Sequence, residues 1–377
     1  MRMKVLAYLA ACLVVVGLAA PAHAQEAVPG PCEEGRFETG ALWKICVPAA
    51  GWNQQLLVYA HGYVPNLPGL SELGFYDVLP DGTELSTLVQ RVGFAYATTS
   101  YRQNGLAILE GVEDVRDLVR LFHQRVGEPR RTYATGGSEG GLVATLLAER
   151  SPELFTGALA ACGPIGGFRF QINYFVDFRA LFDYFFPGVL VGSPIDIPAG
   201  EITAWLDGSL PAQVRARLEQ GPARALELMK VSRAPHDPDN FETVTSTALS
   251  VLAYNVLATN DARAKLGGNP FDNRARWYSG SSNDARLNRG VRRFAADPAA
   301  IEALRQYETS GRLSIPLVTM HTTGDDTVPF THEVLYSFKL QLADRGAFIP
   351  LPTLRYGHCD FTVPEVLTAF AVLLAHP

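Results

Sequence analysis

The 377-residue sequence predicts a mixed α/β fold, in which a mostly parallel sheet is covered by helices on both faces. Short apolar runs of strand type alternate with longer segments whose apolar residues recur at helical spacing. With 47% hydrophobic and 19% charged residues, the composition is that of a globular protein. The alternation lapses once, over a long segment that we interpret as an insertion into one domain.

The predicted elements follow one another in a regular order. Candidate strands lie at 55–60, 94–100, 131–135 and 155–161, and candidate helices lie at 111–126 and 140–150. After the lapse, strands are expected at 315–320 and 352–356, followed by a C-terminal helix at 364–375. Near the N-terminus a hairpin is predicted, with 37–40 and 41–45 as its arms.

The first 24 residues are expected to be a signal peptide. Arg2 and Lys4 give a positive start, 5–20 is an apolar run, and 22–24 offers the small residues that flank a cleavage site. The mature chain then begins near Gln25, and a periplasmic or extracellular location is expected.

Two other interpretations of this segment are weaker. Residues 9–12 resemble a lipobox, but the apolar stretch continues well past Cys12. The run is also short for a membrane-spanning helix, and no other long apolar stretch follows it. No stable membrane span is therefore expected in the mature chain.

The lapse divides the mature chain into three predicted parts. Residues 25–162 form the first part of the core, 163–313 form a lid-like insertion, and 314–377 form the second part of the core. The insertion lies where a lid would sit. Its aromatic run at 168–186 either lines a substrate pocket or packs inside the lid, and the sequence favours neither.

Four of the five cysteines remain after the signal peptide, and an oxidising compartment favours disulfides between them. Cys32 and Cys46 bracket the predicted hairpin and are the natural first pair. Cys162 and Cys359 would then form the second. Four cysteines allow three pairings, and the sequence does not exclude the other two.

The central motif is Gly136-Gly137-Ser138-Glu139-Gly140, which fits G-x-S-x-G. A strand-type run precedes it and a helix-type run follows it. Gly136 and Gly140 are needed because a side chain at either position would collide with the neighbouring strand or helix. An ordinary serine in a glycine-rich turn is the alternative, but the context favours Ser138 as a nucleophile.

A serine hydroxyl needs a general base, and the base needs an orienting acid. His358 follows the last predicted strand and is the expected base, with His321 and His332 as rivals. Asp325 follows an earlier strand and is the preferred acid because its spacing to the next V-P pair fits. The adjacent Asp326 is the alternative.

Backbone donors are also needed for the oxyanion of the tetrahedral intermediate. The N–H of Glu139, directly after the nucleophile, is one expected donor. The N–H of Tyr63 is the other, because Gly62 lets the loop after the strand at 55–60 turn inward. His61 is expected to hold this loop in place and to transfer no proton.

On these motifs the chain resembles the α/β-hydrolases, nearest to their esterase and prolyl-oligopeptidase-like branches. The resemblance runs over 55–375 apart from the insertion. It implies an α/β-hydrolase fold with an eight-stranded, mostly parallel sheet. It also implies ester or amide hydrolysis through an acyl-enzyme.

The pair His358-Cys359 resembles the tannase and feruloyl esterase group, in which a disulfide ties the nucleophile loop to the histidine loop. Here the residue before Ser138 is Gly137 and not a cysteine. Cys162, at the end of the next predicted strand, would do a similar job if it pairs with Cys359.

We therefore expect hydrolysis of a small-molecule or polymer ester, without a cofactor or metal. The formal net charge is -6 and no basic stretch stands out, which argues against nucleic acid as a partner. A serine peptidase of prolyl-oligopeptidase style is one alternative, although no N-terminal repeat supports it. A non-catalytic binding protein is the other, and the apparently complete triad argues against it.

Overall fold

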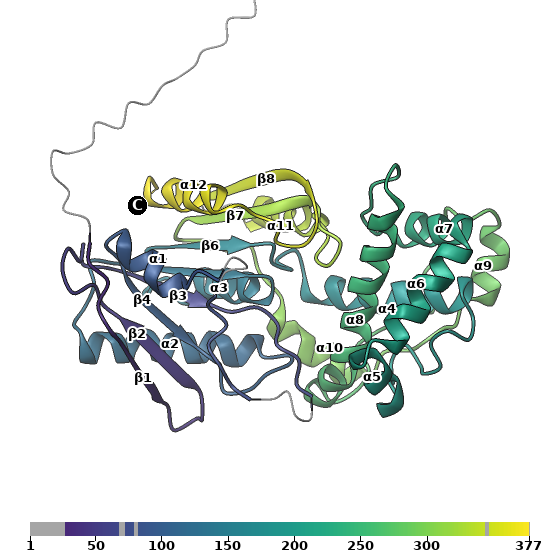
Figure 1. Cartoon of the computed structure of the whole chain (residues 1–377), viewed down its shortest axis with the longest axis horizontal. Helices are drawn as coiled ribbons and strands as arrows, with labels where there is room; N and C mark the ends of the chain where they lie inside the picture. The colour runs from purple at the N-terminus through teal and green to yellow at the C-terminus, as the bar shows by residue number, and fades with distance from the viewer. Residues whose placement is uncertain (1–26, 68–71, 79–81, 344–346, 377) are drawn as a thin grey trace, which may run out of the picture.

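The computed structural model describes residues 27–67, 72–78, 82–343 and 347–376, and the predicted signal peptide at 1–24 lies outside them. The strands are β1 (Cys32–Arg36), β2 (Leu42–Cys46), β3 (Gln55–Ala60), β4 (Ala95–Thr99), β5 (Arg131–Gly137), β6 (Gly157–Ala161), β7 (Leu317–Gly324) and β8 (Phe348–Tyr356). They form one eight-stranded sheet in the order β1-β2-β4-β3-β5-β6-β7-β8 (Figure 1). The mixed α/β prediction is confirmed.

Strand direction brings the predicted motifs together. The strands from β4 to β8 in this order run parallel, whereas β1 and β2 pair antiparallel with their neighbours. The parallel strands therefore end at one edge of the sheet, and the loops that follow them share that edge. Gly62 follows β3, Ser138 follows β5, Asp325 follows β7 and His358 follows β8.

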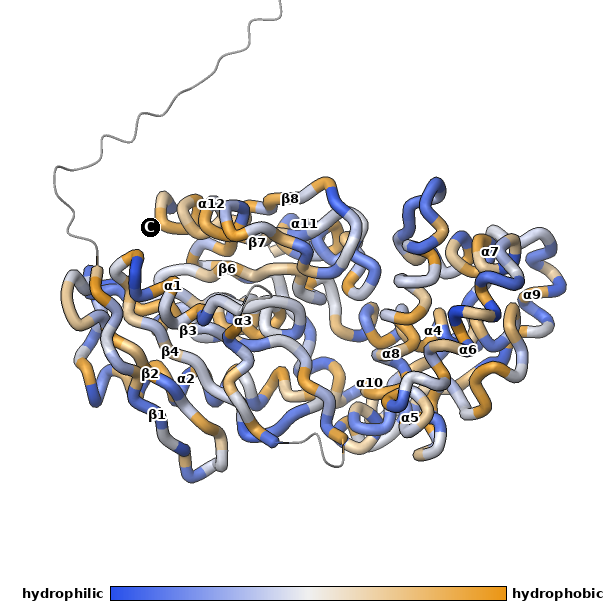
Figure 2. The backbone as a smooth tube through the Cα atoms, viewed as in Figure 1, coloured by the Kyte–Doolittle hydropathy of each residue, from blue (hydrophilic) through white to orange (hydrophobic). Residues whose placement is uncertain are grey.

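Helices cover both faces of the sheet because the central strands are apolar on both sides. The covering helices are α1 (Leu85–Arg91), α2 (Ile108–Arg125), α3 (Glu139–Arg150), α11 (Thr331–Ala343) and α12 (Val363–Leu374). On β3, Leu56 and Val58 belong to the cluster packed with α2 and α3, while Leu57 belongs to the cluster packed with α1 and α12. Figure 2 shows hydrophobic residues along α12 and along the central strand β6.

The hairpin forms, but the prediction of 37–40 as its first arm is wrong. Those residues are the turn, and β1 and β2 are the arms, with Cys32 opposite Cys46. Gly40 has a φ of 93°, and the Phe37 N–H donates to the Ala41 carbonyl at 2.8 Å. A glycine in this left-handed region closes the turn where the sequence pattern suggests a strand.

Between β6 and β7 the chain is mostly helical. The helices are α4 (Phe168–Phe185), α5 (Ala199–Leu206), α6 (Ser209–Gln220), α7 (Pro222–Ser232), α8 (Phe241–Leu266), α9 (Asp284–Gly290) and α10 (Pro298–Leu304). We call 168–290 the cap, which lies to the right of the sheet in Figure 1. It has its own hydrophobic cluster, whereas Ala300, Leu304 and Leu313 pack into the main core. Within the described residues, none of the helices combines the length and apolarity needed to cross a membrane.

A buried charge cluster holds the cap helices together. Arg179 on α4 is fully buried and donates from Nη1 to Glu201 Oε1 on α5 at 2.6 Å. Its Nε donates to Asp183 at 2.9 Å, and its Nη1 also reaches the Asn255 side chain on α8 at 3.2 Å. One guanidinium therefore links three helices.

Candidate active site

The turn between β5 and α3 is sharp and crowded. Ser138 has φ 55° and ψ −123°, an unfavourable conformation for a residue with a side chain. A Cβ on Gly136 would lie 2.2 Å from the Gly140 carbonyl oxygen, and one on Gly140 would lie 2.1 Å from the Ala60 carbonyl oxygen. The glycines at both predicted positions are thus needed for space.

The structure brings Ser138, His358 and Asp325 together. The Ser138 Oγ lies 2.9 Å from His358 Nε2. His358 Nδ1 lies 2.9 and 2.8 Å from the two carboxylate oxygens of Asp325. With its proton on Nδ1, the imidazole donates to Asp325 and accepts the serine hydroxyl proton at Nε2.

Asp325 and Asp326 have different surroundings. The fully buried Asp325 accepts from the N–H groups of Thr327 and Val328 at 3.0 and 2.8 Å, which orients its carboxylate toward His358. Asp326 instead accepts from the Tyr356 hydroxyl at 3.3 Å. Of the two acids left open by the sequence, Asp325 is the one placed against the histidine.

His321, a rival base in the sequence, lies on the far side of Asp325. Its Nε2 is 3.4 Å from Asp325 Oδ2 and donates to the Val328 carbonyl at 2.7 Å, while its Nδ1 is 3.2 Å from Glu333 Oε1. Burial opposes the charged imidazole, but Asp325 and Glu333 outweigh it and raise the pKa of His321 to about 9. Burial likewise opposes the charged form of Asp325, yet His358 and His321 lower its pKa to about 2.

His332, the other rival, is remote from the serine. Its Nδ1 accepts from the Gly166 N–H at 3.1 Å, and its Nε2 lies 2.8 Å from the Gln171 side-chain oxygen. Burial lowers the pKa of His332, so the ring is neutral. It joins α11 to the start of α4.

The loop after β3 lies directly beside Ser138. A Cβ on Gly62 would lie 3.3 Å from the Gly137 carbonyl oxygen and 3.4 Å from Ser138 Cβ, so the backbone of this loop lies close against Ser138. His61 is buried, stacks on Tyr101 with ring centres 3.9 Å apart, and has Nδ1 2.7 Å from the Gly62 carbonyl. Burial lowers the pKa of His61, which fits the expected structural role.

The two predicted oxyanion donors belong to the loop after β3 and to α3, and both of these segments border Ser138. Tyr63 lies in the loop after β3, and its side chain lines the same cavity as Ser138. Glu139 is the first residue of α3, where the N–H groups have no partner inside the helix and point at its N-terminal end. This arrangement can hold a negative oxygen beside the serine.

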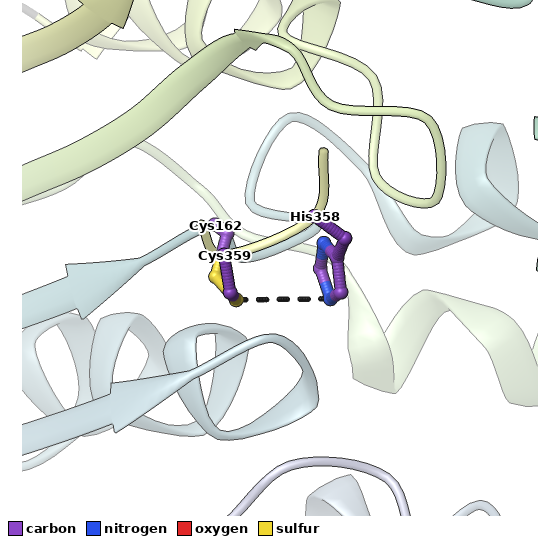
Figure 3. A group of neighbouring side chains, drawn as sticks. All are labelled: Cys162, His358 and Cys359. Carbon is purple, nitrogen blue, oxygen red and sulfur yellow. Dashed lines mark hydrogen bonds between the residues drawn. A yellow bond between two sulfur atoms is a disulfide. The ribbon is translucent and has the colours of Figure 1, made fainter. Parts of the chain in front are cut away.

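A disulfide joins the end of β6 to the residue after the candidate base. Cys162 and Cys359 are bonded with Cα atoms 5.4 Å apart, and Cys32 is bonded to Cys46. Figure 3 shows the disulfide beside the His358 ring, with Cys359 Sγ 3.7 Å from Nε2. Although these three residues cluster as metal ligands might, both sulfurs are in the disulfide, so only the imidazole is left to bind a metal.

An apolar cavity of about 90 Å³ lies between Ser138 and the cap. One face of α4 supplies Phe168, Ile172 and Phe175 to it, while Phe178 and Phe182 pack in the cap's own core. The aromatic run therefore both lines the cavity and packs inside the cap, the two roles between which the sequence does not decide.

Two ionisable side chains that line this cavity have raised pKa values. Tyr254 of α8 stacks on Phe175 with ring centres 4.9 Å apart. Burial and the nearby carboxylates of Glu139 and Asp325 raise the pKa of Tyr254 to about 12. A hydrogen bond with Ser138 acts in the opposite direction and lowers this pKa, but it is outweighed. Burial also raises the pKa of Glu139 to about 8. The sequence offered no signal for Tyr254, which lies outside every motif.

Cap and core are tied together next to the site. Tyr356 is the last residue of β8, and its hydroxyl lies 3.0 Å from the Thr243 carbonyl oxygen and 2.8 Å from Thr247 Oγ1, both on α8. The Gln171 side chain on α4 donates to the Thr327 carbonyl at 2.8 Å. The Gln171 contact attaches the cap to the loop that carries Asp325, and the Tyr356 contacts attach it to the end of β8.

The strand order, the sharp turn after β5 and the loops gathered at one edge define the α/β-hydrolase fold. No family model and no curated protein matches the sequence.

Solved structures resemble the chain at low identity. Acylaminoacyl peptidase from Pyrococcus horikoshii is 12% identical with a TM-score of 0.43, over 89% of this chain and only 38% of that one. Feruloyl esterase B from Aspergillus oryzae is 14% identical with a TM-score of 0.47, over 87% and 74%. An esterase from Pyrococcus furiosus is 11% identical with a TM-score of 0.47, over 91% and 88%.

Proposed function

We propose that the protein hydrolyses carboxylic esters, with Ser138 as nucleophile, His358 as general base and Asp325 as orienting acid. The observation that carries the proposal is the continuous chain of contacts from Ser138 Oγ through both nitrogens of His358 to the Asp325 carboxylate, each at 2.8 to 2.9 Å. The apolar cavity at Ser138 supports an ester with an apolar group as the substrate.

The proposed reaction has two steps, acylation of Ser138 and hydrolysis of the acyl-enzyme. The Ser138 oxygen adds to the acyl carbon as its proton passes to His358, while the N–H groups of Tyr63 and Glu139 bind the oxyanion. Collapse breaks the bond between the acyl carbon and the alcohol oxygen, and His358 gives its proton to the leaving alcohol. Water then adds to the acyl-enzyme by the same route, and the carboxylic acid and the Ser138 hydroxyl are restored.

We also propose that the protein is exported. The signal-like segment at 1–24 supports this, because its positive start and apolar run are those of an exported chain. The two disulfides support it independently, since such bonds persist in oxidising compartments.

Turnover of p-nitrophenyl esters by the purified protein tests the enzyme proposal. Ser138→Ala should lower kcat by at least about 10³-fold because the nucleophile is lost. Ser232→Ala is the matched control: Ser232 donates to the Leu228 carbonyl within the cap and should be dispensable.

Labelling with a fluorophosphonate probe separates the alternatives. An esterase or a peptidase reacts at Ser138, and a peptide panel then distinguishes the two. A binding protein does not react. Ester turnover that survives in Ser138→Ala, or a protein that neither reacts with the probe nor cleaves any ester, would refute the proposal.

A further inference from the structure

A second and larger cavity reaches Ser138 from another direction. It has a volume of about 450 Å³ and lies between the sheet and the helices α1 and α12. Its apolar walls come from the sheet and from both helices, and include Leu57, Leu159, Met320, Leu88, Leu367 and Phe370. We call it the α1–α12 channel.

The channel is apolar from the protein surface to the nucleophile. Val92, directly after α1, is 50% exposed, and Val366 and Leu367 on α12 are 37% and 41% exposed. All three line the channel, and Ser138 lines its inner end. An apolar group can therefore approach the serine from between α1 and α12.

The two cavities meet at Ser138 but touch different parts of the site. Tyr63, Ser138 and Tyr254 line both. His358 lines only the channel, whereas Glu139 lines only the cap-side cavity. The general base thus lies on one side of the nucleophile and a predicted oxyanion donor on the other.

This asymmetry orients an ester. During acylation the protonated base must deliver its proton to the leaving alcohol oxygen, so the alcohol leaves on the side of His358. The acyl group then lies on the opposite side, in the smaller cavity. We propose, resting on the ester hydrolysis proposed above, that the α1–α12 channel binds a long apolar alcohol and that the cap-side cavity binds a compact acyl group.

Two ester series test the assignment. At fixed acetate, lengthening the alcohol from ethyl through butyl to octyl should raise kcat/KM by roughly fourfold per buried methylene until the channel is filled. At fixed ethanol, lengthening the acid from acetate to octanoate should give no such rise. A rise with acyl length and none with alcohol length would reverse the assignment and overturn the proposal.

Variants locate the effect in the channel. Leu88→Trp narrows it from α1, and Leu367→Trp narrows it from α12, so either variant suffices if the other fails to fold. Each should lower the preference for octyl over ethyl acetate by about tenfold. Leu354→Trp, at a position on β8 that is 90% exposed and outside the channel, is the matched control and should leave both rates unchanged. An unchanged preference in both channel variants would overturn the proposal.

A binding measurement separates this proposal from the enzymatic one. Titration calorimetry should detect octan-1-ol binding to the Ser138→Ala protein and a loss of binding when Leu88→Trp is added. If no ester is cleaved, the proposal of ester hydrolysis fails. Octan-1-ol binding would then still show whether the channel binds a long apolar alcohol. If esters are cleaved and octan-1-ol does not bind, the channel proposal alone fails.

Discussion

Asp325 lies between two imidazoles, and only one of them faces the nucleophile. His321, on the other side, holds its proton more tightly in the folded protein because Asp325 and Glu333 outweigh burial and raise its pKa to about 9. Its stabilising contribution is complete below about pH 6.5 and is lost as the pH rises through about 9. His321 is therefore a positioning residue that keeps Asp325 charged and oriented.

Replacing His321 by Gln should remove this pH dependence. We expect the difference in the free energy of unfolding between the wild type and His321→Gln to shrink by up to about 3 kcal/mol between pH 6.5 and 9 in urea titrations. His332→Gln is the control, because burial lowers the pKa of His332 and it stays neutral across this range. A difference that does not vary with pH would contradict the assignment.

The glycines around Ser138 differ in how much space there is for a side chain in their place. Gly140→Ala should disrupt the turn and abolish activity, because its Cβ would lie 2.1 Å from the Ala60 carbonyl oxygen. Gly137→Ala should fold, because its Cβ would meet only Cys359 Sγ, at 4.0 Å. Circular dichroism and ester turnover check both variants, and an active Gly140→Ala protein would refute the steric argument.

At the scale of the elements, the Cys162–Cys359 disulfide holds the end of β8 against the end of β6 and so fixes the His358 loop. Replacing both cysteines by Ala should lower kcat and destabilise the protein by up to about 5 kcal/mol, given the 197-residue separation. The pair Cys32→Ala and Cys46→Ala, remote from the serine, should cost about 3 kcal/mol and leave kcat unchanged. Equal effects of the two pairs on kcat would exclude a role in placing His358.

Arg179 holds the cap helices α4, α5 and α8 together through its buried hydrogen bonds. Arg179→Met leaves the Glu201 carboxylate buried without its partner, so we expect a loss of about 3–5 kcal/mol in thermal or urea unfolding. The control is Arg215→Met, which breaks a surface pair with Glu242 and should have little effect on stability because water screens the pair. Similar costs for the two variants would show that the cluster is not structurally important.

At the scale of the whole molecule, local patterns predict the sheet well because most of its strands are buried on both faces. β3 is a mostly apolar run, β5 is buried along its middle, and the glycines around Ser138 identify the sharp turn. The first hairpin arm was not predictable from alternation alone, since the conformation of Gly40 decides where the turn falls.

Contacts between distant segments account for what the sequence does not reveal. His321 and Glu333 belong to β7 and α11, and nothing in their spacing indicates that His321 lies between the carboxylates of Asp325 and Glu333. Tyr254 reaches Ser138 from the middle of a 26-residue helix that reads as ordinary cap packing. The α1–α12 channel likewise depends on the gap between two helices that pack on the sheet, and local sequence patterns do not predict that gap.

The order of the chain has a consequence for biosynthesis. His358 follows Ser138 by 220 residues, with the whole cap between them. At ribosomal rates of about 5–20 residues per second, the serine is made roughly 10–40 s before its base. Under the proposed mechanism, Ser138 is then without its base and Cys162 without its disulfide partner, so catalytic competence would arise only with the last strand and its loop.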